Sequence, residues 1–137
     1  MSDWSEQKKE LKIQQGIRQA EDDLVIAIQK ALDNSKYGEL EESQFRNLVR
    51  VSDTTESTEV IKNFIRYQVG RDEKWGKGKE SLAEQIIQDI DNLINNLSKK
   101  IAQEAKSENL NHILLELTRR YLGYGSRYLV YKRKGQS

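Results

Sequence analysis

The chain contains no proline in 137 residues. Proline makes up about 5% of an average protein and is the residue that most strongly ends a helix, because it lacks a backbone N–H and its ring clashes with the preceding turn. Its absence therefore permits long helices throughout the chain. The charged content of 33% and the hydrophobic content of 36% suit helices that each bury one narrow apolar face.

Five segments place apolar residues three or four positions apart, the spacing that aligns side chains on one face of a helix. The expected helices cover 5–33, 39–51, 58–70, 81–106 and 107–134. The last two follow one another almost directly, so they should pack as an antiparallel hairpin. The predicted fold is all-α: a single-domain helical bundle of about five helices, with a long C-terminal helical hairpin and no sheet.

Local signals indicate several helix ends. Ser81 and Glu84 form a capping-box pattern, and Ser57 or Thr58 is placed to cap the third helix. Gly70 is expected to end that helix in the left-handed conformation. The weakest segment is 124–131, whose glycines and Tyr-Leu-Val-Tyr run also have β character, so an extended tail is the structural alternative there.

The segment 107–134 combines an apolar stripe with a positively charged end. The stripe residues, spaced to face the core together, are Leu110, Ile113, Leu114, Leu117, Tyr121, Tyr124, Tyr128 and Tyr131. No acidic residue follows Glu116, and six cations give this end a charge of +6. Residues 1–116 carry 17 cations and 22 acids, a net charge of −5. The total of +1 therefore hides a polarised molecule.

Residue types that usually perform catalysis are scarce. The absence of cysteine excludes disulfides, thiolate zinc sites and cysteine nucleophiles. The single histidine, His112, adjoins the apolar stripe and is predicted to be a packing residue. Neighbouring acids, such as Asp89 and Asp91, fall on different helix faces and form no evident metal or acid/base pair. We therefore expect no enzymatic activity, no cofactor and no metal site.

Neither a secretory signal nor a membrane span is apparent. The first ten residues have no apolar region, and no apolar run approaches the roughly 18 residues that a spanning helix needs. We expect a soluble cytoplasmic protein without membrane contact.

The segment 71–79 has the composition of an exposed loop, with two glycines, four basic residues and Trp75. Trp75 either stacks on a base or ribose, or folds back as a hydrophobic plug. Trp4 similarly either packs the first turn of its helix onto the bundle or contacts a partner.

Positive charge beside aromatic side chains makes nucleic-acid binding the favoured function. The candidate nucleic-acid-binding residues, all cationic, are Arg46, Arg50, Lys62, Arg66, Arg71, Lys74, Lys77, Arg119, Arg120 and Arg127. No acidic residue lies four positions after Arg66, Arg71, Lys74 or Lys77 in the sequence. Arg120 and Arg127 flank the tyrosines of the last helix. The alternative is that these cations complement the acidic first half, within the fold or between neighbouring copies.

Three segments occur in an order that is similar to a known family: 43–49 (SQFRNLV), 64–71 (FIRYQVGR) and the tyrosine-rich last helix. Over residues 43–131 the chain resembles the small subunit of type III CRISPR effector complexes, the Csm small-subunit family in particular. The resemblance implies a non-catalytic helical subunit that stacks in copies along the effector. Its implied partners are guide RNA, target RNA, other effector-complex subunits and neighbouring copies of itself.

The competing function is a helical protein–protein interaction adaptor, whose exposed Tyr and Arg surface binds a protein and never touches nucleic acid. The family resemblance does not extend to residues 1–40.

Overall fold

The structure, a computed structural model, describes residues 2–135. Its elements in chain order are α1 (Ser2–Asn34), α2 (Glu42–Thr54), α3 (Thr58–Arg71), α4 (Leu82–Asp89), η1 (Ile90–Ile94), α5 (Asn95–Ala105), α6 (Leu110–Val130) and η2 (Tyr131–Gly135). The two η segments are π-helical, so α4, η1 and α5 form one continuous rod and η2 extends α6. The predicted all-α bundle is confirmed, and the described residues contain no strand. The extended alternative for 124–131 is wrong, because this segment is helical.

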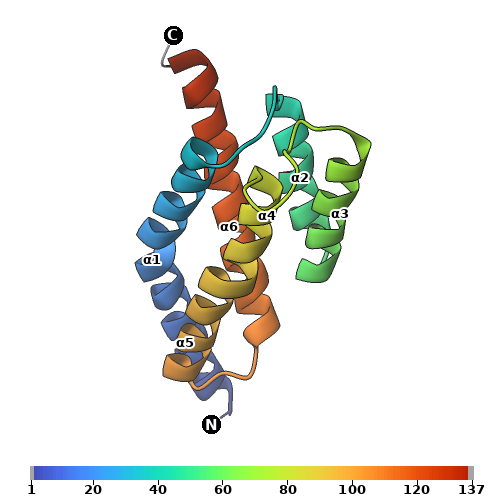
Figure 1. Cartoon of the computed structure of the whole chain (residues 1–137). Coiled ribbons are helices and arrows are strands. Elements are labelled where there is room, and N and C mark those ends of the chain that lie inside the picture. Colours follow the sequence, from blue (N-terminus) through green and yellow to red (C-terminus); the bar gives the residue numbers. More distant parts are fainter. Residues whose placement is uncertain (1, 136–137) are drawn as a thin grey trace.

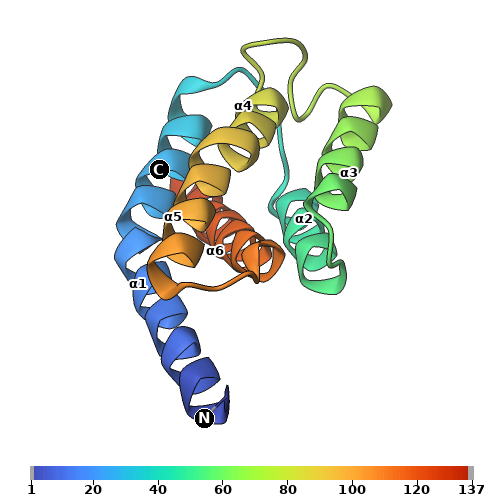
Figure 2. The same cartoon turned by 90° about the horizontal axis from the view of Figure 1, so that it is seen from below.

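Helix α6 occupies the centre of the bundle, with α1 and α5 on one side and α2 on the other (Figure 1). Helices α5 and α6 form the expected hairpin. Helix α3 packs against α2 and lies farthest from α1 (Figure 2). Helix α3 is therefore peripheral to the other four rods, and it presents much of its circumference outward.

Helix α6 is buried around most of its circumference, rather than along the single stripe that its sequence predicts. Its buried residues, which point in several directions, are Ile113, Leu115, Leu117, Thr118, Tyr121, Leu122, Gly125 and Leu129. Contacts with α1 and α5 on one side and α2 on the other require this wider apolar surface. Two predictions are wrong: Tyr131, which follows the end of α6, is 51% exposed, and His112 in the first turn of α6 is exposed rather than packed.

Gly125 allows α6 to approach both α1 and α2 closely. A Cβ atom at this position would lie 2.7 Å from Cγ1 of Ile28 and 2.7 Å from Cζ of Phe45. Gly123 of the same helix is different, since a Cβ there would meet no atom within 4 Å. The two glycines form a matched pair for testing the central position of α6.

We expect Gly125→Ala to lower the free energy of unfolding by about 1–3 kcal/mol, because Ile28 or Phe45 must shift to admit the methyl group. Gly123→Ala should raise it by about 0.5–1 kcal/mol, since alanine favours the helix and meets no obstacle. Urea denaturation of both variants measures the two effects. Equal changes of the same sign would contradict the observed packing around α6.

Helix α1 buries one apolar face, as the spacing in 5–33 predicts, and extends slightly beyond both predicted ends. The buried residues of that face are Ile13, Ile17, Ala20, Leu24, Ile28 and Ala31. Gly16 also has a packing role, because a Cβ there would lie 3.0 Å from two side-chain carbons of Ile101. The side chain of Trp4 lies outside the described residues.

Helix starts match their local sequence signals better than helix ends do. The hydroxyl oxygens of Ser57 and Ser81 accept hydrogen bonds from the amides of Val60 and Glu84, as predicted. Helix α2 begins later than expected, because Glu41 and Gln44 form a capping box. Gly70 does not end α3: the helix continues to Arg71, and Gly70 does not have a positive φ.

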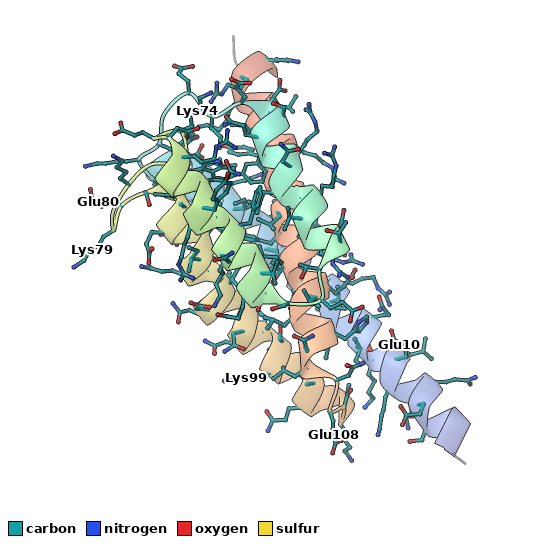
Figure 3. The ribbon with its side chains drawn as sticks, turned by 90° about the vertical axis from the view of Figure 1, so that its right-hand side faces the viewer. Glu10, Lys74, Lys79, Glu80, Lys99 and Glu108 are labelled. Carbon is teal, nitrogen blue, oxygen red and sulfur yellow. The ribbon has the colours of Figure 1, made fainter. Side chains whose placement is uncertain are left out.

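The segment before α4 is anchored to the bundle rather than being an open loop. Trp75 is 1% exposed and lies against Phe45, with 5.5 Å between ring centroids, so it is a hydrophobic plug. Its carbonyl accepts a hydrogen bond from Ala83, and the amide of Gly38 donates to the Lys74 carbonyl at 3.1 Å. The tip of the segment is exposed, and Lys79 projects away from the bundle there (Figure 3).

Candidate RNA-binding surface

The ten predicted cations separate into two groups of five. One group pairs with acids or with backbone carbonyls inside the chain: Lys62, Lys74, Lys77, Arg119 and Arg120. The other group consists of arginines to which the described structure gives no acidic partner: Arg46, Arg50, Arg66, Arg71 and Arg127. Of these, Arg50 donates a hydrogen bond to Oδ1 of Asn47 at 3.1 Å. The distinction matters because a cation that is already paired must lose that partner before it can hold a phosphate.

Lys62 is the most strongly engaged of the first group. Its side chain is almost fully buried, and the ammonium lies 2.6 Å from Asp91 and 2.5 Å from Glu59. Burial alone would lower the pKa of Lys62, but the hydrogen bonds and charges of Asp91 and Glu59 outweigh burial and raise it. Lys62 therefore joins α3 to η1 and is poorly placed to bind RNA.

Arg119 closes the turn between α2 and α3. Its Nε donates to the Ser52 carbonyl at 2.7 Å and its Nη2 to the Thr55 carbonyl at 2.9 Å. Carbonyls at the end of a helix have no partner within the helix, so this guanidinium satisfies groups that α2 leaves open. Its first role in this structure is to fasten the α2–α3 pair to α6.

We expect Arg119→Gln to lower the free energy of unfolding by about 2 kcal/mol, because hydrogen bonds from a charged donor are lost and two carbonyls lose their partner. The matched variant Arg127→Gln should change stability by less than about 0.5 kcal/mol, since Arg127 is exposed. Thermal unfolding of the two variants decides the matter. Equal stability would show that Arg119 does not fasten the turn.

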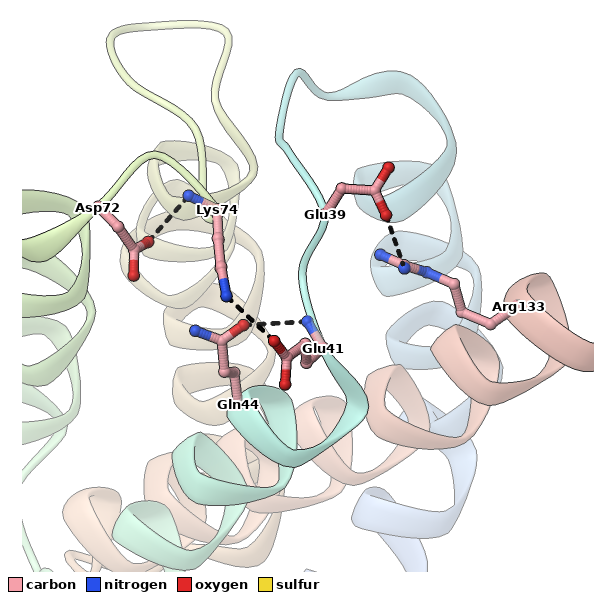
Figure 4. A network of polar contacts seen from close by, with 6 residues as sticks. All are labelled: Glu39, Glu41, Gln44, Asp72, Lys74 and Arg133. Carbon is pink, nitrogen blue, oxygen red and sulfur yellow. Dashed lines mark hydrogen bonds and ion pairs between the residues drawn. The ribbon is translucent and has the colours of Figure 1, made fainter.

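The other engaged cations pair with acids both near and distant in sequence. Arg120 contacts Glu21 at 2.9 Å and Glu116 at 3.0 Å. Lys77 pairs at 2.8 Å with Glu73, which lies four residues before it in the sequence rather than four residues after it. Lys74 reaches Glu41 at 3.1 Å, linking the segment before α4 to the start of α2 (Figure 4).

The basic C-terminal end also pairs within the chain. Lys132 lies 2.7 Å from Asp33, and the Arg133–Glu39 and Lys134–Glu42 pairs are at 3.7 Å and 3.4 Å. Figure 4 shows Arg133 of η2 directed at Glu39 in the segment between α1 and α2. Acidic and basic halves thus complement one another inside a single copy. Because these basic residues pair with acids of the same copy, the opposite charges of the two halves are not by themselves a reason for copies to dock head to tail.

The five arginines without acidic partners lie on the outer surfaces of three helices. Arg46 and Arg50 are exposed on α2, Arg66 and Arg71 on α3, and Arg127 on α6. Helix α2 packs against both α3 and α6, so these arginines come from neighbouring elements. Guanidinium groups suit phosphate because their fixed fork of donors can bind two oxygens at once.

Two of these arginines lie beside tyrosines. The guanidinium carbon is 5.8 Å from the ring centroid in both the Arg71–Tyr67 and the Arg127–Tyr124 pair. Sequence reasoning missed Tyr67, which is 59% exposed. Tyr67 precedes Arg71 by four residues, a spacing that places the two side chains next to each other on a helix and could have indicated this pair.

A groove of about 640 Å³ lies between α1 and α4 and contains the carboxylate of Asp89. That carboxylate accepts hydrogen bonds from Tyr121 at 2.5 Å and from Gln85 at 2.8 Å, and burial raises its pKa.

Among the described residues, no three His, Cys, Asp or Glu side chains gather as a metal site. Within 2–135, no helix is long and apolar enough to cross a membrane.

Comparisons with family models, with curated proteins and with solved structures found no match to this chain. The resemblance to the small subunits of type III effectors therefore rests on the motifs in 43–131.

Proposed function

We propose that this chain is a non-catalytic RNA-binding structural subunit of a type III CRISPR ribonucleoprotein. It stacks in copies along the guide RNA–target RNA duplex, beside other effector-complex subunits, and acts in cytoplasmic antiviral defence. It supplies positive surface and shape, while cleavage belongs to its partners.

The observation that carries the proposal is the group of five exposed arginines without acidic partners. Arg46 lies in the first segment of the family resemblance, Arg66 and Arg71 in the second, and Arg127 in the last helix. The motifs that suggested the family therefore contain cations that the fold leaves available. An RNA backbone can bind such cations without breaking an internal ion pair.

A second candidate is a helical adaptor that binds only protein. It is favoured by α3, where Val60 and Tyr67 are 46% and 59% exposed on one side of the helix. Exposed apolar side chains on a peripheral helix suit a protein partner.

Purification of a tagged form from its native host, followed by sequencing of any bound RNA, separates the two functions. The proposal predicts guide RNA and target RNA together with effector subunits. A triple Gln variant of Arg46, Arg50 and Arg127 should recover less RNA from the same host. Recovery of a protein partner without RNA would instead establish the adaptor.

A further inference from the structure

One exposed face of α3 combines an aromatic ring with two cations. Arg71 lies over the ring of Tyr67, with its guanidinium carbon 5.8 Å from the ring centroid. Arg66 is also exposed and, like Arg71, has no acidic partner in the described structure. The only acid of α3 is Glu59, which is bound to Lys62. This face therefore offers an accessible ring between two cations that form no ion pair with an acid within residues 2–135.

Gly70 leaves the space beside that ring uncovered. It lies inside α3 without a positive φ, and a Cβ at this position would meet no atom within 4 Å. Neither backbone conformation nor packing therefore explains a glycine here, although glycine disfavours helices.

The position of Gly70 relative to its neighbours suggests what the glycine does. It follows Tyr67 by three residues and Arg66 by four, so all three are neighbours on the helix surface. Side chains in a helix lean toward its N-terminus, and a larger residue at 70 would cover the space between Tyr67 and Arg66. The glycine keeps this part of the helix open to a flat ligand.

We infer that Arg66, Tyr67, Gly70 and Arg71 form a binding site for one unpaired RNA base. The base stacks on Tyr67 and lies across Gly70, while Arg66 and Arg71 hold its phosphates. This site rests on the proposed RNA-binding function and adds the part of the RNA that α3 recognises. Stacking accepts any base, because every base has a π face, but a base inside a continuous duplex is already stacked on both sides.

Charge favours a nucleotide over a protein as the occupant. A protein that covered Tyr67 would also desolvate Arg66 and Arg71, which is costly unless it supplied acids to pair with them. A nucleotide supplies both a ring and a phosphate at the required short spacing. The test must still separate the two occupants.

Binding of the purified full chain to a 12-nucleotide single-stranded RNA and to a duplex of the same sequence tests the site. Tyr67→Ala and Gly70→Leu should each weaken single-strand binding by about 5- to 150-fold, the effect of losing one stacked base, and leave duplex binding unchanged. Tyr67→Phe keeps the ring and should bind within about 2-fold of the unaltered chain. Gly70→Leu should raise Tm by about 3 °C, because leucine is the better helix former, so its weaker binding would not reflect unfolding.

Three results would overturn this site. Unchanged single-strand affinity in Tyr67→Ala and Gly70→Leu, with normal RNA binding by the unaltered chain, would remove the site and leave the proposed function standing. Loss of a protein partner in these variants, with RNA affinity intact, would assign the face to protein. Absence of any binding by the unaltered chain would also refute the site, because it is built from one chain alone, whereas the proposed function is decided separately by purification from the host.

Discussion

Replacing Trp75 by alanine is expected to lower the free energy of unfolding by about 3–5 kcal/mol, although the residue lies between helices. Trp75 is the largest of the fully buried side chains and is 1% exposed. Its ring packs on Phe45 of α2, and its carbonyl accepts a hydrogen bond from Ala83 of α4. The substitution therefore removes the side chain that fills the space between α2 and α4, and it leaves a cavity there.

Lys77→Ala is the matched control, since Lys77 is two residues away and exposed. It should change stability by less than about 0.5 kcal/mol. Trp75→Phe should fall between the two, because it loses apolar area but also removes the indole N–H, which has no hydrogen-bond partner. Urea unfolding of the three variants tests the account. A Trp75→Ala protein within 1 kcal/mol of the parent would show that the segment is a connector, as its composition suggests.

The helices were largely predictable, because their signals are local. The spacing of apolar residues predicted all five rods, and Ser57 and Ser81 indicated the starts of two helices. The same local signals gave a wrong end for α3. Glycine is common just after a helix end, but Gly70 lies inside α3. Helix α3 also packs on α2 and α4, and a local pattern contains no information on such contacts.

The candidate surface was less predictable, because it depends on which cations the fold consumes. Lys62 reaches Asp91 on a different element, and Arg120 reaches Glu21 across 99 residues of chain. Each of the two cations also has an acid three or four residues before it, Glu59 or Glu116, a local signal that Arg127 lacks. The contacts with Asp91 and Glu21 depend instead on the packing of α3 against the α4–α5 rod and of α6 against α1, which no local pattern contains.

A large effect on RNA binding is expected from the triple variant Arg46→Gln, Arg50→Gln and Arg127→Gln. We expect its RNA affinity to fall about 10- to 100-fold at low salt, because three phosphate contacts are lost with their counterion release. Stability should remain near that of the parent, since all three side chains are exposed and lack acidic partners within 2–135.

A second triple variant removes the same charge from paired positions. Lys36, Lys74 and Lys77 contact Glu80, Glu41 and Glu73 at 2.8, 3.1 and 2.8 Å. Replacing the three lysines by Gln also lowers the net charge by three, but it removes cations that are already neutralised. Long-range attraction to RNA falls equally in both variants, so any difference between them reports direct contact. Surface ion pairs contribute little to stability, and the control should stay folded.

The most direct measurement is RNA affinity as a function of salt concentration for the parent and the two triple variants. The account predicts that the slope of log affinity against log salt is shallower by about 2–3 in the arginine variant, near 0.7–0.9 for each lost phosphate contact, and close to that of the parent in the lysine variant. Equal slopes for the two variants would contradict this expectation, because RNA would then respond to net charge and not to the three exposed arginines, which have no acidic partner within residues 2–135.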